Sequence, residues 1–293
     1  MVAVSERLPL ARASVLRRLR RLGLGRALLW GFAGLVVVFL VAPIAIIFLT
    51  SLTKTPTVEF PPQGFSLAWY ERFLDTLQGA PGTRPALARS IWFSTYLGLL
   101  VAALATIGGV LSALALHKFL FKGKEFFQNL ILLPLTFPSL VLGVGLLLTF
   151  SELRMFDRFT RLLIGHVVFA LPYVVLSVAA SLKVYEEDVE EAARSLGANP
   201  VQTFWHVTLP LIGPGIFAGA VFAFVSSFTN FTVSFFLSIG SAKPIPIWIY
   251  EFIVNGHDPL LAAISVVLVL LTVVVIVLLE RLVGFRRIVG RTD

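Results

Sequence analysis

A polar loop near residue 190 has the residue types and spacing of a docking element. It begins Glu191-Ala192-Ala193-Arg194-Ser195-Leu196-Gly197 and lies between long stretches without charge. Acids at positions 186–188 suit the positive end of a helix dipole, and Gly197 can end that helix in the left-handed conformation. Asn199 and Pro200 then predict the N-cap and first position of a second helix. The tip of this helix-turn-helix is small and acidic, so the expected chemistry is insertion into a groove on a partner.

The apolar side chains of the first predicted helix fall on one face. Val189, Ala192, Ala193 and Leu196 follow the i, i+3, i+4, i+7 spacing of an amphipathic helix. Because the two alanines are small, we expect this face to seat closely against the partner.

A second group of polar residues lies inside an apolar stretch further along the chain. Six hydroxyl or amide side chains fall within nine positions: Ser226, Ser227, Thr229, Asn230, Thr232 and Ser234. This density predicts a solvated translocation path. The alternative is hydrogen bonding between membrane helices, worth about 0.6 kcal/mol per bond on average. We expect that second role for His166, because no other ionisable group lies in any apolar stretch to take its proton.

The composition indicates an integral membrane protein. Hydrophobic residues make up 57% of the 293 positions and charged residues 14%, with a mean hydropathy of +0.91. Six stretches without Asp, Glu, Lys or Arg are long enough to cross the ~30 Å hydrocarbon core as helices. They are residues 30–52, 90–116, 126–150, 162–182, 215–240 and 260–279. We therefore expect an all-α membrane protein with six transmembrane helices.

The basic residues predict the orientation of these spans. With the N-terminal segment in the cytoplasm, 16 of the 24 Lys and Arg residues fall on the cytoplasmic side. Both termini and the docking loop are then cytoplasmic. The net charge of +8 favours contact with anionic membrane lipid over nucleic acid. The expected organisation is a basic segment 1–29, a transmembrane domain 30–280 containing the loop 183–214, and a cytoplasmic tail 281–293.

Motifs for bond chemistry are missing from the sequence. It contains no Gly-x-x-x-x-Gly-Lys-Ser/Thr phosphate loop, no His-Glu-x-x-His and no nucleophile elbow. The absence of cysteine removes thiolate metal sites. We therefore predict a chain that is not an enzyme and binds no metal or cofactor of its own. If it works in energised transport, the energy comes from another chain.

The docking loop resembles the signature of ABC importer permeases. That signature reads Glu-Ala-Ala, three residues, Gly, nine residues, an aliphatic residue, one residue and then Leu-Pro. Every position is matched, with Val207 as the aliphatic residue. The resemblance implies a type I importer permease fold with a cytoplasmic coupling helix between spans four and five. The residues to which it assigns ATPase coupling are Glu191, Ala192, Ala193, Gly197, Leu209 and Pro210.

The same resemblance implies the partners and the mechanism. The chain would pair with a second permease subunit, as a heterodimer, in a bacterial inner membrane. Two ATP-binding subunits would hold ATP and Mg, and a periplasmic substrate-binding protein would deliver the solute. Transport would follow alternating access, driven by closure of the ATPase pair.

Further stretches are similar to the spermidine/putrescine branch of these permeases. They are residues 60–70, 235–237 and 244–250, together with the last span. Polyamines are therefore the first expected substrates. Members of this branch often carry an acid in the fifth span where this chain has Thr229 and Asn230, and a carboxylate there would favour a cation. An amino-acid derivative or an organophosphonate is the alternative.

Two other classes of function make different demands on the sequence. A membrane enzyme acting on anionic lipid would need an acid/base or metal constellation at an interface. A self-sufficient secondary transporter would need ionisable groups at the midplane or broken helices in paired repeats. Only the prolines within spans, such as Pro134 and Pro138, match the second class. The importer permease is the preferred interpretation.

Overall fold

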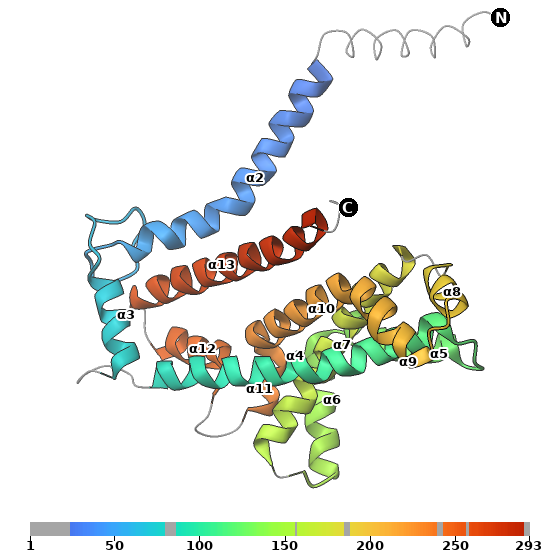
Figure 1. Cartoon of the computed structure of the whole chain (residues 1–293). Helices are drawn as coiled ribbons and strands as arrows, with labels where there is room; N and C mark the ends of the chain where they lie inside the picture. The colour runs from blue at the N-terminus through green and yellow to red at the C-terminus, as the bar shows by residue number, and fades with distance from the viewer. Residues whose placement is uncertain are drawn as a thin grey trace, which may run out of the picture. The chain divides into compact units, whose positions relative to one another are not determined.

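The computed structural model describes residues 24–79, 86–155, 157–184, 188–238, 243–255 and 258–289. All regular secondary structure in these residues is helical (Figure 1), as the composition predicts. The elements are α2 (Leu24–Ser51), α3 (Ala68–Gln78), α4 (Ala86–Lys118), α5 (Lys124–Thr136), α6 (Ser139–Glu152), α7 (Arg158–Val184), α8 (Asp188–Ser195), α9 (Pro200–Thr203), the π-helical turn η1 (Phe204–Thr208), α10 (Leu209–Thr229), α11 (Phe231–Leu237), α12 (Ile245–Asn255) and α13 (Leu260–Val289).

The described residues form two compact units. One lies within residues 1–71 and 257–270, and the other within residues 72–256 and 271–293. The first unit contains α2, whose most apolar window has no buried residue. An uncovered apolar helix of this length suits a surface in contact with lipid.

The C-terminal end of α2 is held by hydrogen bonds to the segment that follows it. The hydroxyls of Ser51 and Tyr70 lie 2.7 Å apart. The indole Nε1 of Trp69 donates to the carbonyl of Thr53 at 2.9 Å. The connection after α2 is therefore folded back on the helix end rather than extended.

The core of the second unit is a bundle of α4, α7 and α10. The three helices pack pairwise against one another along much of their length. Their apolar stripes meet in one cluster of fully buried side chains, which includes Leu97, Val101 and Ala105 of α4, Ala170, Val174 and Val178 of α7, and Ile212 and Ala223 of α10. This bundle carries both groups of residues that the sequence singles out, because α8 and α9 connect α7 to α10.

Small residues on α10 set how closely it approaches α7. A Cβ atom added to Gly215 would lie 2.4 Å from the hydroxyl of Ser181, and one on Gly219 would lie 2.9 Å from Cα of Val174. Both distances are shorter than van der Waals contact. The two helices thus touch along their backbones, a mode of packing typical of membrane helices.

The number of spans is smaller in the described residues than the six predicted. Four helices are long and apolar enough to cross a membrane: residues 25–51, 87–118, 158–183 and 200–229. The pair α5 and α6 makes a fifth if it is one broken span. In α13, the apolar helix found within the described residues covers 260–274. A total of six stays a prediction.

The prediction of a single helix over residues 126–150, kinked at Pro134 and Pro138, was wrong, because the chain forms two separate helices here. α5 and α6 meet at an angle of 110°. Phe137 between them is extended, with φ −83° and ψ 145°. The cause is Pro138, since a proline lacks the amide hydrogen and its ring excludes the preceding residue from the helical conformation.

The prediction of one helix over residues 215–240 was also wrong. The helix is interrupted at Asn230, and positions 239–240 lie outside the described residues. Asn230 has an extended backbone, and its side-chain oxygen accepts from the amide of Val233 at 2.9 Å. Asparagine caps a new helix more readily than it continues an old one, so α11 starts here.

Candidate functional site

The first helix of the predicted docking loop is α8. Three acids occupy its first turn and Arg194 its last, and both placements complement the helix dipole. Of the acids expected in the first turn, those at 186 and 187 lie outside the described residues. Gly197 follows with φ +94°, which confirms its predicted left-handed role. The amide of Ala198 donates to the carbonyl of Ala193, and that of Gly197 to Arg194, so the helix ends in a Schellman motif.

The second helix starts where the sequence predicts. The side-chain oxygen of Asn199 accepts from the amide of Gln202 at 2.9 Å, and the Gln202 side chain accepts from the amide of Asn199 at 3.0 Å. This is a capping box, and Pro200 takes the first helical position. The helix then runs without a break through η1 into α10. The wider π-helical turn directly precedes Leu209 and Pro210, where the proline removes a backbone donor.

The coupling residues suggested by the resemblance lie on or near the surface of this loop. Glu191, Ala192 and Gly197 are exposed and Ala193 is half-buried. At the start of α10, Leu209 is half-buried and Pro210 exposed. The neighbouring apolar side chains are uncovered as well: Val189 is 42% exposed and Leu196 89%. Among the described residues, the face that the sequence predicts as apolar is therefore largely uncovered.

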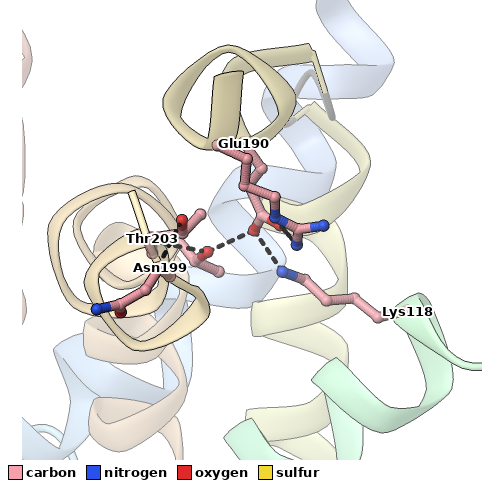
Figure 2. A network of polar contacts seen from close by, with 6 residues as sticks. Lys118, Glu190, Asn199 and Thr203 are labelled. Carbon is pink, nitrogen blue, oxygen red and sulfur yellow. Dashed lines mark hydrogen bonds and ion pairs between the residues drawn. The ribbon is translucent and has the colours of Figure 1, made fainter. Parts of the chain in front are cut away.

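The adjacent Glu190 points inward, which sequence reasoning missed. It is only 7% exposed. Its Oε1 atom pairs with Nζ of Lys118, the last residue of α4, and accepts from the hydroxyl of Thr208 in η1 (Figure 2). Its Oε2 atom lies 3.3 Å from the guanidinium of Arg194, one turn further along α8. One carboxylate thus connects α4, α8 and η1.

The local sequence pattern predicts only one of the three contacts of Glu190. The Arg194 contact has the i, i+4 spacing of a helical ion pair and was visible in the sequence. Lys118 is 72 positions away and Thr208 is 18 positions away. Both contacts depend on how the bundle brings the end of α4 to the loop.

Two residues of the predicted polar path pack inside the protein. The hydroxyl of Ser227 lies 2.9 Å from Nδ1 of His166, and that of Ser234 lies 3.2 Å from Nε2 of the same ring. All three residues are buried. The expected hydrogen-bonded packing role of His166 is confirmed by these contacts.

The other path residues are more accessible. The hydroxyl of Thr229 donates to the carbonyl of Val225 within α10, and Asn230 caps α11. The hydroxyl of Thr232 lies 3.5 Å from that of Ser139, the first residue of α6. Ser226 is half-buried. The structure therefore brings Thr232 to the bend between α5 and α6. Of the six path residues, Ser227 and Ser234 are buried, Thr229 is exposed and the other three are half-buried.

Comparison with known protein families gives a match over more than half of the chain. Residues 105–287 match the model of the family described as "Binding-protein-dependent transport system inner membrane component". The chain belongs to this family. The matched region of the permease starts within α4 and includes the loop, Lys118, Glu190 and the polar run of α10 and α11.

Curated relatives of this permease include permease proteins of transport systems that are named for small amines. It is 30% identical to the spermidine/putrescine transport system permease protein PotC of Escherichia coli K12, covering 87% of this chain and 93% of the relative. It is 29% identical to the putrescine transport system permease protein PotI of the same organism, over 78% and 80%. It is 28% identical to a putative 2-aminoethylphosphonate transport system permease protein, PhnV, of Salmonella typhimurium LT2, over 85% and 91%.

Solved structures share the fold of the permease. A chain of a bacterial ABC transporter involved in the import of the acidic polysaccharide alginate superposes with a TM-score of 0.69. The sequences are 20% identical, and the match covers 90% of this chain and 97% of the other. A second structure of an alginate ABC transporter, in complex with its alginate pentasaccharide-bound periplasmic protein, gives a TM-score of 0.64 at 17% identity. The all-α fold is thus that of an ABC importer permease.

Proposed function

We propose that this permease forms half of the membrane path of an ATP-driven importer for small organic amines. The observation that carries the proposal is the loop formed by α8 and α9. Its turn and cap geometry is locally determined, and in the part of the chain that the structure describes it presents exposed small and apolar side chains. An exposed apolar face of this kind is typical of a surface that another protein covers.

In this proposal α8 is the coupling helix and seats in a groove of a separate ATPase subunit. Ala192 and Ala193 permit close approach, Glu191 contacts the groove, and Gly197 directs the chain into the second helix. Leu209 and Pro210 then pass the motion into α10. A second permease subunit, two ATP-binding subunits that hold ATP and Mg, and a periplasmic binding protein complete the assembly.

The proposed mechanism is alternating access with both termini in the cytoplasm. Closure of the ATPase pair brings the coupling helices together and tilts the bundles, so that the path between the permeases opens outward. The accessible polar residues Ser226, Thr229, Asn230 and Thr232 line this path. Hydrolysis of ATP by the partner subunits then returns the path to the inward-facing state.

The proposed substrate is a small molecule with a primary amine. Three relatives are named for spermidine, putrescine and 2-aminoethylphosphonate. These three molecules share a primary amine and differ in their other charged groups. Polyamines are the first choice, since these relatives have the higher identities. The neutral Thr229 and Asn230 favour hydrogen bonding to the substrate over a fixed carboxylate.

The test of coupling is Ala193→Asp, with Ala193→Ser as the matched small variant. We expect Ala193→Asp to abolish uptake and pull-down of the ATPase subunit, because an unpaired charge would be desolvated in the groove. Ala193→Ser should retain both. Full association and uptake in Ala193→Asp would show that α8 is a plain connector.

The test of substrate uses the cognate binding protein and a panel of putrescine, spermidine, 2-aminoethylphosphonate and a zwitterionic amino acid. We expect tight binding of at least one polyamine. Binding of the phosphonate alone would replace the polyamine assignment and leave the permease assignment intact. Binding of none of the amines would refute the substrate class.

A further inference from the structure

Glu190 is the one buried residue of α8. The apolar side chains of this helix, by contrast, are more accessible: Val189 is 42% exposed, Ala192 is exposed and Ala193 is half-buried. Apolar packing therefore contributes little to holding α8 on the bundle. Within the described residues, the polar contacts of Glu190 connect this helix to the end of α4 and to η1.

The chemistry of a buried carboxylate makes this connection depend on specific donor groups. A carboxylate out of water needs hydrogen-bond donors on both oxygens. Lys118 and Thr208 supply donors to Oε1, and Arg194 supplies one to Oε2 (Figure 2). Lys118 ends α4, and Thr208 ends the π-helical turn that leads into α10. The side chain is thus held between the end of α4 and the turn that leads into α10.

We infer that Glu190 is a positioning residue of the coupling step, which joins α8 to α4 and α10 so that the three move as one body. The inference rests on the proposed function, because it assigns the route by which motion of the docked helix reaches the bundle. Without the link, α8 would remain docked on the ATPase but would pivot about the turn at Gly197. The motion would then be lost before it reached α4.

The first test is Glu190→Gln, which keeps the shape and removes the charge. The control is Glu125→Gln, a similar change at an exposed residue in the first turn of α5. We expect Glu190→Gln to retain pull-down of the ATPase subunit and basal ATP hydrolysis. Uptake per ATP hydrolysed should fall by roughly tenfold, since the neutral amide no longer pairs with the charge of Lys118 and a partly buried ion pair is lost. The control should match the parent protein.

The second test restores the link covalently. The chain has no cysteine, so Lys118→Cys and Glu190→Cys can be combined and joined with a short bifunctional maleimide. We expect the double variant to be uncoupled before cross-linking and to recover uptake after it. Each single cysteine variant, treated in the same way, should not recover.

The outcomes separate this inference from the proposed function. Loss of ATPase association in Ala193→Asp with full coupling in Glu190→Gln would overturn the inference alone. Cross-linked protein that stays docked but transports no better than before would also overturn it, because the three elements would then have to separate during the cycle. Unchanged association in Ala193→Asp would refute the coupling role of α8 itself.

Discussion

The imidazole of His166 and the hydroxyl of Ser227 are 61 positions apart in the sequence and lie 2.9 Å apart within the buried core. The second ring nitrogen of His166 lies 3.2 Å from the hydroxyl of Ser234. A neutral imidazole donates from one nitrogen and accepts at the other, so one ring satisfies both serines. Because Ser227 is on α10 and Ser234 on α11, the histidine holds the two helices on either side of the interruption at Asn230.

This relationship predicts that His166→Leu destabilises the permease. The change leaves two buried hydroxyls without their partner, and each unsatisfied group costs about 1–3 kcal/mol. Adding Ser227→Ala and Ser234→Ala should recover part of that loss, since no polar group then stays unpaired. Thermal unfolding of the purified subunit measures both effects. Uptake abolished in His166→Leu at an unchanged melting temperature would instead assign the ring to the translocation path.

Asn230 is predicted to have two roles that substitution can separate. Asn230→Leu removes the cap of α11, which is worth about 1 kcal/mol, and also removes a polar group from the proposed path. Asn230→Ser keeps a capping oxygen but shortens the side chain. We expect Asn230→Ser to melt like the parent and to show reduced uptake. If uptake in both variants follows melting temperature alone, Asn230 is only a cap.

Gly197 is predicted to be required for its backbone conformation and not for space. Apart from its chain neighbours, no described residue has an atom within 4 Å of a Cβ built on it, but its φ of +94° disfavours side chains with a β carbon. Gly197→Val should lower ATPase-coupled uptake strongly, because a left-handed residue costs roughly 1–2 kcal/mol and a β-branched one more. Gly197→Asn should retain most activity, since asparagine tolerates this region. Equal loss in both variants would point to a contact with the partner.

Gly213→Ala serves as the control for the effect of adding a methyl group. Gly213 lies in α10, has open space around the position of an added Cβ atom and does not have a positive φ. Uptake by this variant should equal that of the parent. A loss there as large as in Gly197→Val would remove the argument from backbone strain.

The orientation is tested by single cysteines in a chain that has none. We expect Gln63→Cys to react with an impermeant maleimide added outside the cell. Lys122→Cys, in the exposed connection between α4 and α5, should react only after the membrane is opened. The opposite pattern would invert the topology derived from the basic residues.

The sequence by itself determined the features that depend on neighbouring residues. Long uncharged stretches predict helical spans, because the lipid interior offers no hydrogen-bond partner to backbone groups. The end of α8 at Gly197 and the start of α9 at Asn199 also follow from single residues whose conformational preferences outweigh their surroundings. The signature from Glu191 to Pro210 was readable for the same reason, since its spacing is a property of one loop. Pro138 was visible as a helix breaker too, but the angle it produces was not.

Only the tertiary structure decided which polar groups share a partner. Glu190 and Glu191 are adjacent and chemically identical, yet the first is buried against Lys118 and the second is exposed. Likewise, Ser227 and Ser234 meet His166, whereas Thr229 bonds within its own helix. The reason is physical. A buried polar group must find a donor or acceptor wherever packing brings one, and packing joins positions that are far apart in the sequence and whose pairing no local pattern encodes.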